Sequence, residues 1–431
     1  MMIKKLRANW LSIALTIVVL VSLLLSGIVW TNPFQSDYFH RENGTNNQQL
    51  AAQSIGDVYL PTMIVRTNND GDQQLLYSQH KDLIYQAKEK LASWQLGRTS
   101  TVKTNNSDVY LSYLRHHDSL MLSYPDNIPG TVFNETFKQS VDISRVKRIN
   151  HIVIPLDGSR ELYLLSDYHY GVYRVRIAKG DPQKIVTNMH GLTPINVDHR
   201  IVNGHAVMVY LHSFALPRLA YQISDQKISS LSANLMSTTQ HANFTTHQDG
   251  NHVVYTDGTN RHLVYDSARG TVNYENEVGR SNENNINQLY SHFYHALTKT
   301  GMPLNNVRFD EVTNHGRTIT YRSYVEGFPI INDDNYGGAK LQADANGVER
   351  YLMSLYTVQV PLPLDGSTVR LPSTNSVLNQ LHNSSHFRDI TDLRVGYEWK
   401  TEPTNHQTVK MEPTYFAKYH GKWVNYTALL K

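Results

Sequence analysis

Residues Trp10–Pro33 read WLSIALTIVVLVSLLLSGIVWTNP, and this stretch decides how the rest of the chain is organised. From Leu11 to Val29 it carries no charged residue. A helix of roughly 20 apolar residues crosses the hydrocarbon core of a bilayer, whereas the apolar core of a signal peptide is only about 7–15 residues long. Such a peptide also ends at a small-x-small cleavage site, which the bulky residues after Gly27 disrupt. The sequence therefore predicts a permanent transmembrane helix over residues 11–29.

The residues that flank this helix predict its orientation. Basic residues precede the apolar run, and the next basic residue after it is Arg41. The positive-inside rule then places residues 1–10 in the cytoplasm and about 400 residues outside the membrane. Tryptophans bracket the run, as they do at the level of the lipid headgroups. The residues that set this topology are Lys4, Lys5, Arg7, Trp10 and Trp30.

One face of the predicted membrane helix carries small side chains. Ala14, Ser22 and Ser26 are separated by multiples of four residues, so they nearly line up along the helix. Small residues allow a second helix to approach closely, and in lipid this close packing drives helix association. This face is the candidate contact surface for a partner helix in the membrane.

The composition excludes several classes of protein. Hydrophobic residues make up 40% of the chain and charged residues 18%, which favours a folded core over disorder. The chain has 40 basic and 37 acidic residues, mixed along its length, so no basic face for nucleic acid emerges. There is no cysteine, which excludes disulfides and thiolate chemistry.

The region after the anchor predicts an α+β fold of mostly antiparallel sheets with packed helices. Apolar residues recur at helical spacing over residues 80–96 and from Ile286 to Leu297, and Gly follows each run. The run DVYLPTMIVRT at 57–67 and the alternating stretch at 173–177 are typical of strands. Near the C-terminus, EPTYFAKYHGKWVNYTAL predicts a hairpin that turns at His420–Gly421. We expect a stalk at 30–56 and three α+β domains at 57–187, 188–284 and 285–431.

No motif singles out a reaction centre. The chain has no G-x-S-x-G elbow, no H-E-x-x-H and no phosphate-binding glycine loop. His292 and His295 lie one turn apart on a predicted helix, but no third metal ligand follows at a usual spacing. A Ser-His-Asp triad can assemble from distant positions, so the sequence leaves that possibility open. We assign no catalytic, cofactor-binding or metal-binding residue, and expect a protein that is not an enzyme and needs no cofactor.

Three features, taken in order, resemble the YycH family. The first is the N-terminal apolar helix that ends in IVWTNP. The second is YRSYVEGFPII at 321–331, followed by ADANGVERYLMSLYTVQV at 343–360. The third is LRVGYEW at 393–399, followed by MEPTYFAKYHGKWVNYTAL at 411–429. The second and third features are also similar to the sister family YycI.

The resemblance implies a function that the residues alone do not. Proteins of this family lie outside the membrane of Gram-positive bacteria on one N-terminal helix. They act, together with YycI, on the sensor histidine kinase WalK (YycG) of the WalK–WalR system, which governs cell-wall metabolism. Contact with the kinase is attributed largely to the membrane helices. The expected partners are therefore WalK, a YycI-like membrane protein and the lipid bilayer, with no nucleic acid.

Two other functions remain compatible with the sequence. The chain could be an extracytoplasmic binding module for cell-wall polymer or peptide, held by a plain anchor, with aromatic stretches such as YHYGVYRV as its surface. It could also be a wall-active hydrolase, which would need a polar cluster in a cleft that the sequence does not reveal. In every case we expect a single-pass cell-membrane protein whose N-terminus is cytoplasmic.

Overall fold

The computed structural model describes Val19, Ser22 and residues 54–77, 82–185, 192–202, 205–236, 244–258, 260–277, 286–304, 306–362, 366–402 and 405–430. Residues 53–431 form one compact unit and residues 1–52 another, and the fold below is that of the larger unit. No helix in these described ranges is long and apolar enough to cross a membrane. Apart from Val19 and Ser22, the anchor predicted at 11–29 lies outside the described residues.

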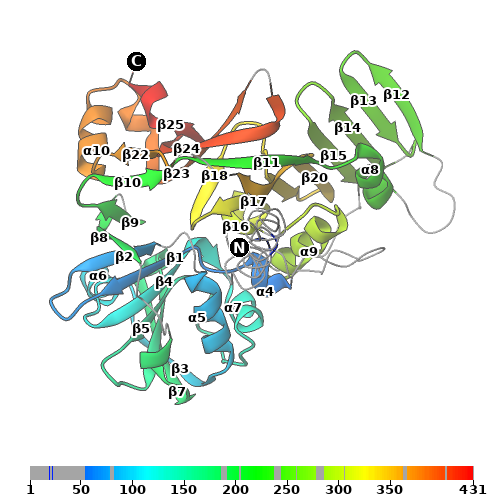
Figure 1. The fold of residues 1–431 in the computed structure, drawn as a ribbon. Helices are drawn as coiled ribbons and strands as arrows, with labels where there is room; N and C mark the ends of the chain where they lie inside the picture. Colours follow the sequence, from blue (N-terminus) through cyan, green and yellow to red (C-terminus); the bar gives the residue numbers. More distant parts are fainter. Residues whose placement is uncertain are drawn as a thin grey trace, which may run out of the picture. The chain divides into compact units, whose positions relative to one another are not determined.

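A nine-stranded sheet of entirely antiparallel pairs contains the first half of the described chain (Figure 1). Its strands lie in the order β3-β7-β6-β5-β4-β1-β2-β8-β9. They comprise β1 Met63–Thr67, β2 Gln73–Tyr77, β3 Gln95–Lys103, β4 Ser119–Ile128, β5 Ile149–Pro155, β6 Glu161–Ser166, β7 Gly171–Lys179, β8 Thr193–Val202 and β9 His205–Tyr210.

Helices cover both faces of this first sheet, because successive side chains of a strand point to opposite faces. Ile64 belongs to the same buried cluster as α5 and α7, whereas its neighbour Val65 belongs to the cluster that includes α6. The three helices are α5 Leu83–Ala92, α6 Ser107–Leu114 and α7 Gly130–Thr136.

A larger sheet contains most of the second half of the chain. Its main path is β12-β13-β14-β15-β20-β19-β17-β18-β23-β24-β11-β21, with β16 beside β17 and β25 beside β24. All of its pairs are antiparallel except β18 with β23. Its strands are β11 Leu219–Asp225, β12 Thr245–Asp249, β13 His252–Thr256, β14 Arg261–Asp266, β15 Thr271–Glu277, β16 Val307–Thr313, β17 Thr318–Val325, β18 Phe328–Ile331, β19 Gly338–Ala343, β20 Val348–Ser354, β21 Tyr356–Leu362, β23 Ile390–Glu402, β24 Asn405–Tyr419 and β25 Lys422–Asn425.

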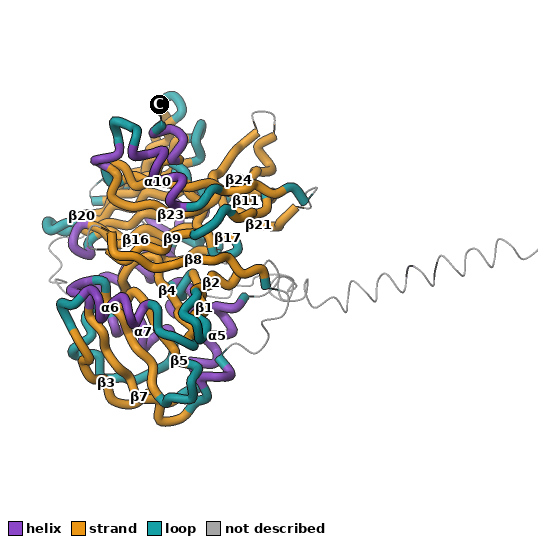
Figure 2. Tube along the Cα trace, turned by 90° about the vertical axis from the view of Figure 1, so that its left-hand side faces the viewer, coloured by secondary structure: helices purple, strands orange, loops and turns teal. Residues whose placement is uncertain are grey.

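Shorter elements complete the fold. A two-stranded sheet pairs β10 (Phe214–Pro217) with β22 (Thr368–Leu371). Helices α8 (Ile228–Met236) and α9 (Ile286–Lys299) pack against the larger sheet, and α10 (Thr374–His382) lies near the C-terminus. Figure 2 shows the first sheet below and strands β23 and β24 above.

Two hydrophobic clusters join the two sheets. The larger runs from Val58 to Leu355 and includes side chains from α5, α7, α8 and α9 and from strands of both sheets. The second includes Val65 of the first sheet and Val325 of the larger one. Both clusters therefore contribute to the contact between the sheets.

Several sequence-based predictions are confirmed. Helix α9 occupies Ile286–Lys299, and Gly301 adopts φ 71° just after it. The expected hairpin at His420–Gly421 is present, with φ 47° and 75° at these residues. The sheet-rich α+β fold class also agrees with the prediction.

The predicted strand at 57–67 is wrong at its start. Residues Ile55–Val58 form the short helix α4, and strand β1 begins only at Met63. Ser54 and Asp57 form a reciprocal capping box. It satisfies backbone N–H groups at the start of the helix that have no partner within the helix.

The structure also shows which sheet each segment joins. Strands β8 and β9 pair onto the first sheet, whereas β11 to β15 join the larger one. The segment 188–284 thus supplies strands to both sheets. The three-domain division at 187 and 284 stays a prediction about how the chain folds.

Candidate functional site: the joint at Tyr59

Residues 54–59, which we call the joint at Tyr59, are the first described residues of the larger unit. They contact a helix of the first sheet and elements of the larger sheet. Ser54 starts the joint: its backbone N–H donates to Asp57 Oδ2 over 3.0 Å, and its hydroxyl donates to the same oxygen over 2.7 Å. Lys88 of α5 forms an ion pair with the other carboxylate oxygen. Burial alone would raise the pKa of Asp57, but Lys88 and Ser54 outweigh it and hold that pKa below its usual value.

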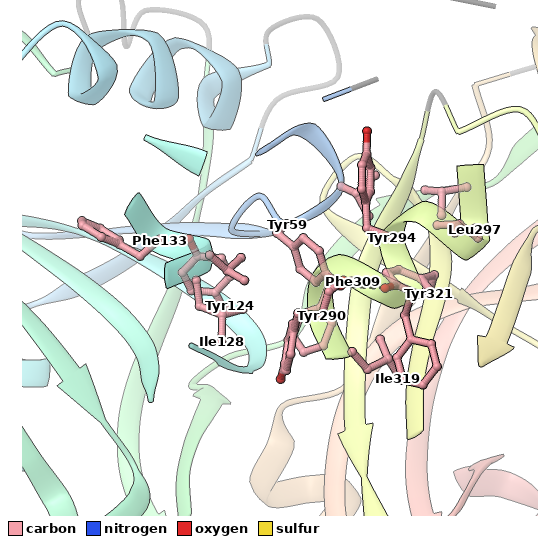
Figure 3. Packing of buried hydrophobic residues seen from close by; sticks show 14 of the residues in the cluster. Tyr59, Tyr124, Ile128, Phe133, Tyr290, Tyr294, Leu297, Phe309, Ile319 and Tyr321 are labelled. Carbon is pink, nitrogen blue, oxygen red and sulfur yellow. Dashed lines mark hydrogen bonds between the residues drawn. The ribbon is translucent and has the colours of Figure 1, made fainter. Parts of the chain in front are cut away.

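Tyr59 is fully buried at the centre of this joint (Figure 3). Its hydroxyl donates to the carbonyl oxygen of Tyr290 in α9 over 3.0 Å. Because that bond uses the only hydroxyl proton of Tyr59, the hydroxyl of Tyr321 in β17 donates to the Tyr59 oxygen, 2.6 Å away. Burial raises the pKa of Tyr59 well above its ordinary value, so the phenol stays neutral.

Aromatic rings surround Tyr59 and fix its orientation. The ring centroids of Tyr290 and Phe309 each lie 5.5 Å from that of Tyr59, and the Tyr321 ring packs edge-on at 6.0 Å. Such tilted and edge-on pairs contribute about 0.5–1.5 kcal/mol each beyond their buried area. One residue of the entering chain is thus held by α9, β16 and β17 together.

Helix α4 also packs closely against α7. A Cβ added to Gly56 would lie 3.0 Å from the backbone Cα of Thr136, so only glycine allows this approach. The last part of the predicted stalk, residues 54–56, therefore belongs to the folded unit.

A buried ionic cluster fastens the larger sheet next to this joint. Asp310 of β16 has a fully buried side chain and accepts from Arg322, Arg394 and Tyr324 over 2.7–2.8 Å. Burial alone would raise the pKa of Asp310, but the two guanidinium groups lower it strongly overall. The guanidinium carbon of Arg394 also lies 3.9 Å from the ring centroid of Trp423. Strands β16, β17, β23 and β25 are cross-linked by these contacts.

A second polar cluster lies under α6 and brings together Ser, His and Asp. His151 Nδ1 is 2.8 Å from Ser123 Oγ, and His151 Nε2 is 3.5 Å from an oxygen of Asp167. Tyr110 of α6 donates to the same Asp167 oxygen. Ser123 is only 8% exposed, so the serine is covered by protein, and the long His–Asp distance is not that of an oriented general base. We interpret the cluster as structural.

His199 completes this buried polar region. Its Nδ1 donates to Gln73 Oε1 over 2.8 Å, since an amide oxygen can only accept. Complete burial, and then the neighbouring His151, lower the pKa of His199 to about 3, so the ring is neutral near neutral pH.

An open pocket of about 540 Å³ lies beside this region. Its walls are mostly polar and come from the turn before β2, the end of α6, strand β8 and the segment after β9. Arg115 in its wall donates to Asp198 over 2.8 Å, so its charge is already compensated. The lining residues are Gly71, Asp72, Gln73, Gln74, Arg115, Asn196, Val197, Asp198, Leu211 and His212.

The structure does not test the roles predicted for the residues that orient the membrane helix or form its partner face. Ser22 is described, and it is helical and exposed. The other positions lie outside the described residues; they are Lys4, Lys5, Arg7, Trp10, Ala14, Ser26 and Trp30. The joint itself was missed by sequence reasoning, because the partners of Tyr59 are more than 200 residues away in the chain.

The histidine pair on α9 has a structural explanation. His292 Nε2 lies 2.6 Å from Glu349 Oε1 of β20, and His295 is exposed. In the described part of the chain, no three His, Cys, Asp or Glu residues are arranged to hold a metal ion.

The fold and this entry joint define a class of sheet-rich, two-sheet proteins that has a solved representative. The crystal structure of YycH from Bacillus subtilis matches with a TM-score of 0.69 over 87% of this chain and 98% of that one, at 15% sequence identity. The N-terminal and C-terminal domain models of the YycH protein match residues 8–194 and 208–431. The chain therefore belongs to the YycH family. No curated protein matches it by sequence.

Proposed function

We propose that this chain is a non-enzymatic, membrane-anchored regulator of the sensor histidine kinase WalK, acting with a YycI-like partner in cell-wall homeostasis signalling. The observation that carries the proposal is the match of both YycH domain models across nearly the whole chain. The anchor at 11–29, with Ala14, Ser22 and Ser26 on its contact face, is the expected effector element, and the ectodomain lies outside the membrane.

The joint at Tyr59 supports a mechanical role for the ectodomain. A regulator shifts a kinase between two signalling states only if it binds those states unequally. A thousandfold difference in affinity corresponds to about 4 kcal/mol. Because Ser54 to Tyr59 are fixed against both sheets, an event in the ectodomain reaches the chain at Ser54 without passing through a flexible link inside the fold.

Co-purification of the kinase tests this proposal. The full chain is compared with a variant in which residues 11–29 are replaced by an unrelated apolar span. A finer pair of variants compares A14L/S22L/S26L with Thr16→Leu, a change on another side of the helix. We expect the native chain and Thr16→Leu to recover the kinase, and the other two to lose it. Equal recovery by all four would place the contact in the ectodomain, and recovery by none would contradict the kinase partner.

The pocket beside β8 favours a second candidate function. Its polar wall, in which Arg115 is paired with Asp198, suits an uncharged polar ligand, such as a segment of wall peptide or glycan. In this account the helix is a plain tether, and the full chain binds isolated wall material whether or not residues 11–29 are replaced. Substitution of Asn196 by Leu would abolish such binding, and unchanged binding would exclude the pocket.

A further inference from the structure

The contact between the two sheets contains a partly buried carboxylate at the end of β4. Asp126 accepts the backbone N–H of Val312 in β16 over 2.9 Å, and also the backbone N–H of its neighbour Asn127 over 2.6 Å. The hydroxyl of Tyr290 in α9 donates to the carbonyl oxygen of Asn127 over 3.0 Å. This short segment of the first sheet is therefore held by two elements of the second half of the chain.

A second partly buried carboxylate lies on the other side of the same contact. Glu326 occupies the tight turn between β17 and β18, with φ 53°, and Gly327 follows with φ 86°. The hydroxyl of Tyr77 in β2 donates to the Glu326 carboxylate. A Cβ on Gly327 would lie 3.2 Å from the carbonyl oxygen of Thr62, so the turn is pressed against the first sheet.

Neither carboxylate has a cationic partner among the described residues. The titratable groups that face Asp126 are Glu311 of β16 and Tyr290 of α9, and those that face Glu326 are Tyr77 of β2 and Tyr397 of β23. The cations nearby have other partners. Lys418 pairs with Glu311, and both arginines of the adjacent cluster pair with Asp310. Arg148, which acts on Tyr290, lies over the ring of Tyr168.

Because no cation is paired with Asp126 or Glu326, ionisation of either carboxyl group destabilises the closed contact. Burial raises the pKa of Asp126 to about 6 and that of Glu326 to about 7. Their ordinary values are 3.8 and 4.5, which apply once water reaches the groups. At a pH between the ordinary and the raised pKa values, the two carboxyl groups are protonated in the closed contact. They would release these protons if the sheets separated. Acidification therefore favours the closed contact, and rising pH through this window favours separation.

We propose that Asp126 and Glu326 form a proton-operated clasp between the two sheets, which tightens as the surroundings acidify and loosens toward alkaline pH. Through the Asp126 segment, which Tyr290 contacts, the clasp acts on the core that holds Tyr59, so a change of pH outside the membrane alters how firmly the entering chain is held. The inference concerns the ectodomain alone and does not depend on which partner the membrane helix contacts.

Hydrogen–deuterium exchange on the full chain in detergent tests this clasp. The peptides to follow are those covering β16 and the turn at Val325–Phe328, with β5 and β6 as an internal reference for global opening. After correction for the intrinsic rate of exchange, we expect opening at the clasp to rise about tenfold or more between about pH 5 and about pH 7.5, because each pKa unit of linkage contributes a factor of ten.

Neutral variants show whether these two side chains are responsible. In Asp126→Asn with Glu326→Gln the pH dependence of opening should disappear, while Glu89→Gln, which alters an exposed carboxylate on α5, should keep it. The reference strands report whether the variant remains folded. A clasp region whose exchange follows β5 and β6 at both pH values, or a double variant with unchanged pH dependence, would overturn the proposal.

Discussion

The hydroxyl of Tyr59 donates a hydrogen bond to the carbonyl oxygen of Tyr290, a residue 231 positions later in the chain. The first residues after α4 are thereby tied to the helix that opens the C-terminal part of the fold. The contact consequently makes the two halves of the ectodomain depend on each other.

Tyr59→Phe should lower the free energy of unfolding of the full chain by about 1–3 kcal/mol. The substitution keeps the ring contacts but leaves the Tyr290 carbonyl and the Tyr321 hydroxyl without their shared partner. Denaturant unfolding measures the change, with Tyr168→Phe as the control, since Tyr168 is 55% exposed. Equal stability of the two variants would show that the buried hydroxyl contributes nothing.

Asp310→Asn should be more damaging, at about 3–5 kcal/mol, because it leaves two buried arginines without a counter-charge. The guanidinium groups of Arg322 and Arg394 each lie 2.8 Å from the carboxylate. Asp333→Asn changes an exposed carboxylate in a loop of the same half of the chain and serves as the control. A loss below about 1 kcal/mol, the usual range of exposed pairs, would contradict the buried cluster.

His199→Asn should reduce the loss of stability in mild acid. The pKa of His199 is lowered to about 3 in the folded chain from an ordinary value of 6.5, so the unfolded chain takes up a proton first as the pH falls. This residue therefore destabilises the native chain progressively below 6.5 and down to about 3. Asparagine keeps a donor for Gln73 and cannot titrate.

The unfolding free energy measured at several pH values should thus fall less steeply in the variant than in the native chain. His199 and the clasp carboxylates act in opposite directions over part of this range, so global stability cannot replace the local exchange measurement. A variant with an unchanged pH profile would show that His199 titrates alike in the native and unfolded chains, which would contradict its lowered pKa.

The elements that sequence reasoning predicted well are those with local signals. Helix α9 has an apolar stripe and a following glycine, and the last hairpin has a His-Gly turn suited to positive φ. The end of helix α4 was predicted as strand because the apolar run at 57–67 continues into β1. The single capping residue Ser54 is a weaker sequence signal than this run.

The joint and the clasp could not be predicted, because they depend on pairings between distant segments. Nothing near Tyr59 in the chain indicates Tyr290 or Tyr321, and Asp126 resembles an ordinary turn residue beside Asn127. The assignment of β8 to the first sheet likewise rests on its pairing with β2, which no local spacing encodes. The anchor face at Ala14, Ser22 and Ser26 stays a prediction.

The rate of kinase autophosphorylation in reconstituted vesicles tests the central claim most directly. WalK is incorporated alone, with the full chain, and with the chain whose residues 11–29 are replaced, each with and without the YycI-like partner. The account predicts that the native chain changes the rate and that the replaced chain does not. If the native chain, with the partner present, leaves the rate of WalK unchanged, the chain does not regulate this kinase and the account is contradicted.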